Sequence, residues 1–339
     1  MSRILVTGAS GFLGSVVVDQ LLAADYKVRG TVRSSKADRV KKAYASFGDK
    51  FEITVVDDLA TSDLTAAFQG VTALIHVGSP LAGSAVAEEV LKSAISGTER
   101  VLDFAVKAGV KKVVVTSSVA AMTQPSDMFV DRTFDETEWN PMTYEEASKP
   151  EASGFEVYCA SKKLAEEVVW KFAKEHPNID FATVNPSFLY GPSGRGQVLD
   201  SPANGTNAMV YALIKGPKGR PIPNQVLFPN FIHVADAAKA HVLALAAPPS
   251  KTPKRLIVNG GSVTWKQAAQ YLAESRPDLK DRLPVITGDE KVPEVWAKFD
   301  TSSAERLIGL KDYINWKETI SSTIDDILER EKAFGVAVL

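Results

Sequence analysis

The sequence predicts an α/β fold in which a doubly wound parallel sheet lies beside a smaller, mainly helical and discontinuous lobe. Three observations predict it: apolar strand-like runs alternate with helical segments, glycines cluster directly after the first run, and the composition changes after Tyr190. Apolar strands that alternate with helices are typical of a parallel sheet with both faces covered. Strands are predicted near residues 3–7, 27–32, 51–56, 73–77, 111–116 and 179–184.

The first strand and the first helix enclose a glycine-rich turn. Residues 4–6 are apolar, glycines follow as Gly8, Gly11 and Gly14, and a helix is predicted over Ser15–Ala24. Gly8 allows a tight turn, Gly11 lets the backbone approach a pyrophosphate, and Gly14 lets the helix lie close to the strand. The amides at the helix start would bind phosphate oxygens. A turn without a ligand is the alternative, but the flanking strand and helix favour a dinucleotide site.

Basic residues follow the second strand. A site that prefers NAD would place an acid here, about 20 residues past the glycines, to bind the ribose 2′-hydroxyl. This chain has Arg33, then Lys36 and Arg39, and no acid. A guanidinium can hold a 2′-phosphate with two hydrogen bonds. The pattern therefore predicts NADP(H), and the alternative is that Arg33 is a solvated loop charge.

A tyrosine and a lysine four residues apart precede the helical run Leu164–Lys174. Tyr158 and Lys162 would share one helix face, so both side chains could enter one pocket. A tyrosine has a reference pKa of about 10, and a fixed cation beside it is expected to lower that pKa. Tyr158 could then exchange a proton with a carbonyl or alcohol oxygen. A surface Tyr–Lys pair on a helix is the alternative.

The second lobe is predicted from the change in composition. Residues 191–230 are rich in Gly, Pro, Asn and Ser around one expected helix, Ala203–Ile214. A helix over Val234–Ala246 and a strand over Arg255–Asn259 return to the first pattern, and a final amphipathic helix is expected over Trp316–Lys332. The nucleotide domain is predicted to comprise residues 1–185 plus 232–260, and the other lobe residues 186–231 plus 261–339.

The composition argues against several functional classes. A formal net charge of −2 over 339 residues gives no basic footprint for nucleic acid. The four histidines show no metal-ligand spacing, so no metal is expected and each histidine is interpreted as structural. No long apolar run or secretion leader is found, so we expect no membrane span. A single cysteine, Cys159, agrees with a reducing, cytoplasmic location.

Taken together, these motifs resemble the extended short-chain dehydrogenase/reductase family. The glycine turn, Arg33, Thr116-Ser117-Ser118 and the Tyr158/Lys162 pair carry the resemblance. Within the family the chain looks like the fungal aldehyde and methylglyoxal reductases and the plant dihydroflavonol and cinnamoyl-CoA reductases. It departs from the cinnamoyl-CoA reductase signature before the tyrosine, at Glu156 and Val157, which argues against a thioester substrate. The resemblance implies a Rossmann domain.

The resemblance also assigns roles to individual residues. Ser118, Tyr158 and Lys162 match the catalytic residues, and Ser117 could exchange roles with Ser118. The implied substrate contacts are Pro80, Leu81, Ser118, Val119 and Tyr190, with Phe155 and Phe231 as further expected walls of the cleft. The implied cofactor contacts are Gly8, Ser10, Gly11, Phe12, Leu13, Gly14, Arg33, Lys36, Asp58, Leu59, Val77, Gly78, Ser79, Ser117, Tyr158, Lys162, Pro186, Leu189 and Thr206.

The expected function is NADPH-dependent reduction of an aldehyde or ketone, with Tyr158 as the proton donor. A nucleotide-sugar epimerase or dehydratase with tightly held NAD is the first alternative, and the basic residues Lys215, Lys218 and Arg220 could bind its sugar diphosphate. A non-catalytic NADP sensor is the second alternative. The only expected partner besides the cofactor is a small carbonyl compound, and the protein is expected to be a monomer or a homodimer.

Overall fold

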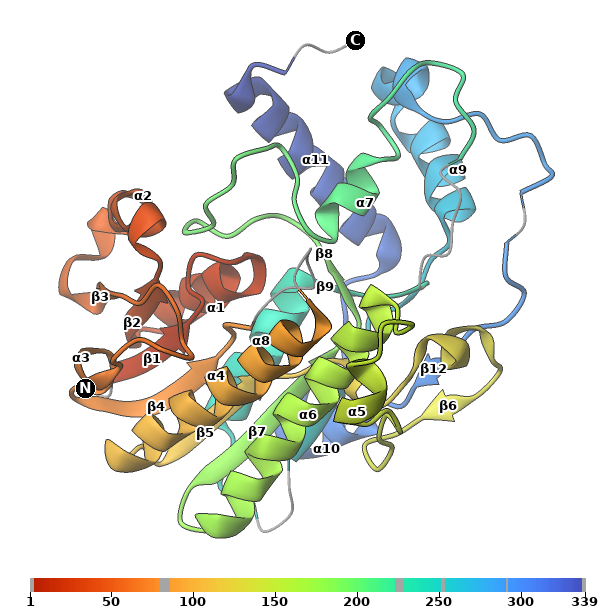
Figure 1. Ribbon diagram of the computed structural model, residues 1–339. Helices are drawn as coiled ribbons and strands as arrows, with labels where there is room; N and C mark the ends of the chain where they lie inside the picture. The colour runs from red at the N-terminus through yellow and green to blue at the C-terminus, as the bar shows by residue number, and fades with distance from the viewer. Residues whose placement is uncertain (1–2, 80–85, 223–228, 251–253, 291, 337–339) are drawn as a thin grey trace.

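A seven-stranded parallel sheet forms the centre of the protein (Figure 1). The computed structural model describes residues 3–79, 86–222, 229–250, 254–290 and 292–336. The strand order is β10-β7-β5-β4-β1-β2-β3, with every pair parallel, so the predicted fold class is confirmed. The strands are β1 (Arg3–Thr7), β2 (Lys27–Val32), β3 (Phe51–Val55), β4 (Val71–His76), β5 (Lys112–Thr116), β7 (Asp180–Pro186) and β10 (Lys254–Val258).

Helices cover both faces of this sheet. The helices α4 and α6 lie on one face, and α1 and α8 pack together on the other (Figure 1). Apolar side chains of the strands alternate between two buried clusters, one for each face, as expected for a sheet buried on both sides. The helices that accompany the seven-stranded sheet are α1 (Phe12–Ala23), α2 (Ala37–Ala43), α3 (Thr65–Phe68), α4 (Ala87–Lys107), α6 (Gly154–Glu175) and α8 (Val234–Ala246).

The order of the strands places a crevice at the end of β1. The chain runs outward from β1 through β2 and β3, and in the other direction through β4, β5 and β7. Thr7 at the end of β1 is in register with His76 at the end of β4. In open parallel sheets, ligands bind outside the carboxyl ends of the strands at this reversal. The glycine-rich turn after Thr7 therefore lies at the expected ligand edge.

A second, smaller core lies beyond that edge. It combines a three-stranded sheet of order β11-β9-β8 with three helices. Tyr190, Phe231 and Trp265 are buried in it with apolar residues of α11. Its elements are β8 (Phe188–Tyr190), β9 (Asn230–His233), β11 (Gly261–Ser262), α7 (Asn207–Tyr211), α9 (Trp265–Ser275) and α11 (Trp316–Phe334).

Smaller elements connect the two cores. β6 (Thr133–Phe134) pairs with β12 (Lys298–Phe299) in parallel, and α10 (Ser302–Ile308) packs on β10 and α8 of the main sheet. Residues 302–308 thus lie with the larger core, although they fall within the range predicted for the second lobe. The remaining short helices are α5 (Tyr144–Ala147), η1 (Ser34–Lys36), η2 (Ala45–Lys50), η3 (Val119–Ala121), η4 (Pro125–Phe129) and η5 (Pro277–Arg282).

One predicted helix has different bounds in the structure, and the helix of the catalytic pair is present as expected. The expected helix over Ala203–Ile214 is reduced to α7, because Gly205 has a φ of 57° and interrupts the helix path just before it. The predicted helix that carries both Tyr158 and Lys162 is confirmed as α6, which begins at Gly154, where Ser153 and Glu156 form a reciprocal capping box. Among the described residues, no helix is long and apolar enough to cross a membrane.

Candidate active site

The glycine-rich turn is closed so tightly that side chains would not fit. Gly8 has a φ of 70°, and a Cβ built on it would lie 2.9 Å from Gly78 Cα. A Cβ on Gly14 would lie 2.2 Å from the carbonyl oxygen of Gly8, so α1 packs directly on the turn. The Gly11 amide donates to Gly8 O at 2.9 Å. This backbone cradle at a helix N-terminus fits the pyrophosphate of a dinucleotide.

The predicted contacts Ser10, Phe12 and Leu13 lie in or beside this turn. Ser10 is buried, and its carbonyl oxygen accepts a hydrogen bond from Val198 N at 3.4 Å. Leu13 is part of the main core and Phe12 packs against it. The side chains of Phe12 and Leu13 are therefore engaged in packing, and their contribution to a cofactor site would come from backbone amides.

Three basic side chains gather beside the end of β2. Arg33 and Arg39 are exposed and Lys36 is half-buried. The pKa of Lys36 is lowered, first by burial and then by the charge of Arg33, while Asp200 opposes the shift. Asp200 also accepts from Arg39 at 3.3 Å. Two carboxylates, those of Asp57 and Asp200, stand against three cations in this group, so the site still fits a further anion such as a 2′-phosphate.

The residues predicted to border the adenine and the nicotinamide lie at the neighbouring strand ends. Asp58 accepts from Ala60 N at 2.8 Å and so caps its own turn, and Leu59 packs against Gly78. The amides of Val77 and Gly78 both donate to Thr7 Oγ1 at 3.1 Å. These bonds fix the end of β4 against the glycine-rich turn.

Two of the catalytic residues expected from the sequence, Tyr158 and Ser118, lie close to each other. Tyr158, in the second turn of α6, is half-buried, and the Ser118 side chain lies close enough to oppose the rise in the pKa of its hydroxyl. Ser118 Oγ accepts from Ala120 N at 3.2 Å and lies 3.5 Å from Pro186 O. Phe155 stacks on Tyr158 with ring centroids 6.1 Å apart. The hydroxyl pair thus lies where β5 and β7 end.

The expected lowering of the Tyr158 pKa is not observed. Burial raises the pKa of Tyr158 to about 12, and the group that opposes the rise is Ser118. Lys162 is itself buried, which lowers its pKa to about 8, and its ammonium donates to Ser79 Oγ at 3.1 Å. Desolvation of the phenol therefore outweighs the attraction of a cation to the phenolate. At neutral pH the Tyr158 hydroxyl is protonated and able to donate.

The structure distinguishes between the two serines that the sequence left open. Ser117 Oγ donates to Glu166 Oε2 at 2.5 Å in a buried cluster, whereas Ser118 Oγ faces Tyr158. Ser117 stays a predicted cofactor contact, and because its hydroxyl is bound to Glu166, such a contact would come from its backbone. Ser118 is the serine in a position to contact a substrate oxygen.

Only some of the predicted substrate contacts lie near Tyr158. Tyr190 and Phe231 are both buried in the second core, where Tyr190 packs on Trp265 with centroids 6.1 Å apart. Val119 is buried in a small apolar cluster directly after Ser118. Pro80 and Leu81 lie outside the described residues.

The other predicted cofactor residues and the histidines have clear partners. Thr206 Oγ1 donates to Leu189 O, so this hydroxyl fixes the loop after β8. His76 bonds to Thr7 at 2.7 Å, His241 bonds to Thr116 at 2.7 Å, and His233 caps α8. The structural interpretation fits these three histidines. Within the described ranges no group of His, Cys, Asp or Glu side chains could hold a metal ion.

Sequence reasoning missed Glu166, one helical turn beyond Lys162. Its carboxylate is fully buried and accepts hydrogen bonds from five side chains, including Arg255 at 2.7 Å. The available signal was the spacing, since Tyr158, Lys162 and Glu166 follow one another at intervals of four residues on one helix.

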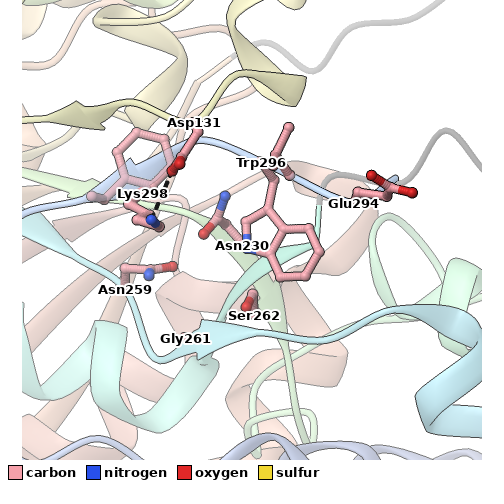
Figure 2. A pocket seen from close by; sticks show the side chains of 10 residues that line it. Asp131, Asn230, Asn259, Gly261, Ser262, Glu294, Trp296 and Lys298 are labelled. Atoms are coloured by element: carbon pink, nitrogen blue, oxygen red, sulfur yellow. Dashed lines mark hydrogen bonds and ion pairs between the residues drawn. The ribbon is translucent and has the colours of Figure 1, made fainter. Parts of the chain in front are cut away.

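A pocket of about 510 Å³ lies apart from these residues (Figure 2). Trp296 and Phe299 form apolar parts of its lining, Asn230 and Asn259 polar parts, and Lys298 is paired with Asp131 at 2.7 Å. None of Ser118, Tyr158 and Lys162 lines it. The triad of Ser118, Tyr158 and Lys162 and this pocket are therefore separate sites in the fold.

The chain belongs to the NAD dependent epimerase/dehydratase family, which it matches over residues 4–260. The matched span contains the glycine-rich turn, Ser118, Tyr158 and Lys162. The predicted membership of the extended short-chain dehydrogenase/reductases is thereby confirmed.

Several of the similar proteins are named as reductases. The NADPH-dependent methylglyoxal reductase GRE2 of Saccharomyces cerevisiae is 32% identical over 347 residues, covering 97% of this chain and 98% of that protein. The ketoreductase azaE of Aspergillus niger is 32% identical over 322 residues, covering 91% and 92%. The crystal structure of Gre2 with NADPH from Candida albicans superposes with a TM-score of 0.87 at 28% identity, covering 97% of this chain and 99% of that one.

Proposed function

We propose that this chain reduces the carbonyl group of an aldehyde or ketone to an alcohol, with NADPH as the hydride donor. The observation that carries the proposal is the Ser118–Tyr158 hydroxyl pair, with Lys162 beside it, at the strand edge that also holds the glycine-rich turn. The named activities of the similar reductases support the same reaction.

The proton chemistry follows from the state of the two hydroxyls. Bound NADPH would supply the hydride. Tyr158 is protonated at neutral pH, because burial raises its pKa to about 12, so it can donate to the oxygen as negative charge develops there. Ser118 would donate to the same oxygen and orient it. Lys162 is a cation below a pH of about 8 and stabilises the phenolate that remains after the proton has been given up.

The preference for NADPH over NADH would come from the basic group at the end of β2. Arg33, Lys36 and Arg39 would bind the 2′-phosphate, and the backbone of the glycine-rich turn would bind the pyrophosphate. Similar proteins support this assignment, since GRE2 is named as NADPH-dependent and a Gre2 structure contains NADPH.

Two observations disfavour the epimerase or dehydratase alternative. Val119, where dehydratases place an acid, is buried among apolar side chains. Of the basic residues considered for a sugar diphosphate, Lys218 pairs with Asp281 at 2.7 Å, and Arg220 donates to the carbonyl oxygen of Leu213 at 2.8 Å. A sensor without activity is disfavoured by the intact triad.

The proposal extends to the surroundings of the enzyme. Cys159 is a buried, free thiol, which supports a reducing, cytoplasmic location. We propose a small carbonyl compound as the substrate and a monomer or homodimer as the working form.

The test is a substrate panel followed by the loss of NADPH absorbance. Methylglyoxal, aromatic aldehydes, β-ketoesters and dihydroflavonols would each be offered to the wild type and to Tyr158→Phe. We expect turnover of at least one class and a fall in kcat of about 10²- to 10⁴-fold in the variant, with unchanged NADPH affinity. Undiminished turnover in Tyr158→Phe would disprove the assignment, and co-purified NAD without any carbonyl reduction would favour the epimerase.

A further inference from the structure

We infer that Glu166 is a positioning residue that holds Ser118 against Tyr158 through a buried hydrogen-bond network. The inference rests on the proposed reductase function and adds a residue that does not touch the reacting atoms. Glu166 lies on α6, two turns after Tyr158 and one turn after Lys162, so the helix that carries the proton donor also carries the anchor.

One oxygen of Glu166 is directed toward the serine pair. Oε2 accepts from Ser117 Oγ at 2.5 Å and from Asn185 Nδ2 at 2.7 Å. The same Asn185 amide donates to the carbonyl oxygen of Ser118 at 3.2 Å. Ser118 is therefore tied to Glu166 on both sides, through its chain neighbour Ser117 and through its own carbonyl group.

The other oxygen holds the carboxylate in place. Oε1 accepts from Arg255 Nε at 2.7 Å, Thr183 Oγ1 at 3.0 Å and Trp170 Nε1 at 3.1 Å. These donors lie on β10, β7 and α6, so the carboxylate links the catalytic helix to two strands of the sheet. The Arg255 guanidinium also lies 3.9 Å from the centroid of the Trp139 ring.

Burial of a charged carboxylate costs free energy, which argues that the network serves to fix the position of Ser118. A buried ion pair is weak evidence for stability, because well-packed apolar residues often serve as well. A buried polar network does define one arrangement of the groups that it satisfies, and both oxygens of Glu166 are satisfied here. Here the members that lead toward the active site end at Ser118, through Ser117 and through the Asn185 amide that donates to the Ser118 carbonyl oxygen.

Three variants separate positioning from packing. Glu166→Gln is nearly isosteric, and its carbonyl oxygen can still accept from Arg255, while its amide replaces the oxygen that serves Ser117 and Asn185. Ser117→Ala removes one link to Ser118 and leaves the carboxylate charged, so it remains informative if the first variant folds poorly. Trp170→Phe is the matched control, because it removes a donor to the same carboxylate on the side that leads away from Ser118.

The experiment measures kcat, KM for the carbonyl substrate, NADPH affinity by fluorescence, and Tm for each variant. We expect Glu166→Gln and Ser117→Ala to lower kcat about 10- to 100-fold, because a small misplacement of a catalytic group costs about this much. NADPH affinity should stay within about twofold, and Trp170→Phe should keep kcat within about twofold, whatever its loss in Tm.

The inference is overturned if kcat of the folded enzyme is unchanged in both Glu166→Gln and Ser117→Ala. It is also overturned if Trp170→Phe lowers kcat as much as these two variants do. Either result would make the network a packing element. Failure of the proposed function looks different. In that case the wild type itself would reduce no carbonyl compound, and Tyr158→Phe would change nothing.

Discussion

Lys162 Nζ lies 5.7 Å from the centroid of the Tyr158 ring and donates a hydrogen bond to Ser79. The two side chains share one face of α6, and the pKa of each is shifted in the direction that favours its uncharged form. Burial raises the pKa of Tyr158 to about 12 and lowers that of Lys162 to about 8. The lysine is therefore the group that titrates within the working range of pH.

The first prediction concerns pH. Lys162 loses its proton as pH rises through about 8, while Tyr158 keeps its proton until about 12. We expect kcat/KM for carbonyl reduction to fall above a pH of about 8, because the cation that stabilises the phenolate is lost. In Lys162→Arg the guanidinium stays charged, so the fall should move to higher pH. An unchanged profile in this variant would assign the titration to another group.

The second prediction concerns the choice of coenzyme. Arg33 faces Lys36 closely enough to lower the pKa of its ammonium group. Arg33→Ala should weaken NADPH binding about 10- to 100-fold, because a hydrogen bond between charged groups contributes about 1.5–3 kcal/mol. NADH affinity should change little. Fluorescence titrations with both coenzymes check this, with Lys41→Ala, an exposed cation on α2, as the control. An equal loss for NADH would contradict a role at the 2′-phosphate.

Much of the fold could be predicted from local patterns in the sequence. The six strands expected in the first half and the helix Val234–Ala246 are present, because buried parallel strands and glycine turns leave signals over a few residues. The start of α6 also has a local signal, because Ser153 and Glu156 form a capping box there. The short α7 depends on the backbone of Gly205, whose left-handed φ is not apparent from hydrophobic periodicity.

The sequence indicated the parts of the candidate site that depend on the spacing of residues along one helix. It did not indicate the contacts between residues that are far apart in the sequence. Tyr158 and Lys162 are four residues apart on one helix, and this spacing alone brings them together. Glu166 and Arg255 are far apart in the sequence, so their ion pair required knowledge of how α6 meets β10. The packing of Tyr190 in the second core was not apparent from the sequence, because an aromatic residue at a strand end can face either core.

The third prediction compares two glycines within helices. Gly14→Ala would place a methyl group 2.2 Å from the Gly8 carbonyl oxygen, so α1 would have to move away from the turn. We expect the free energy of unfolding to fall by about 1–3 kcal/mol or more, as at other overpacked sites. NADPH binding should weaken as well. Gly97→Ala meets nothing within 4 Å and should stabilise α4 by about 0.5–1 kcal/mol. Thermal unfolding of both variants checks the opposite signs, and equal Tm values would refute the prediction.

The fourth prediction concerns a loop that crosses from the second lobe onto the glycine-rich turn. We call residues 193–200 the cover loop, and Tyr44 anchors it. The buried Tyr44 hydroxyl donates to Asp19 Oδ1 at 2.9 Å and accepts from Gly196 N at 3.2 Å. Two residues further along, Val198 N donates to Ser10 O at 3.4 Å, within the turn itself. Release of the anchor should therefore loosen the backbone beside the dinucleotide site.

Tyr44→Phe keeps the ring and removes only the hydroxyl. Gly196 N would lose its partner in a buried position, which costs about 1–3 kcal/mol, and Asp19 would lose a donor that offsets its burial. We expect a lower Tm and faster NADPH dissociation in stopped-flow displacement, with kcat at saturating NADPH within about threefold of wild type. Tyr26→Phe, at a half-buried tyrosine packed on the same core, is the control and should change neither quantity. If Tyr44→Phe lowers Tm but leaves the dissociation rate unaltered, the cover loop stabilises the fold without retaining the coenzyme, because a loop that retains the coenzyme must release it faster once its anchor is gone.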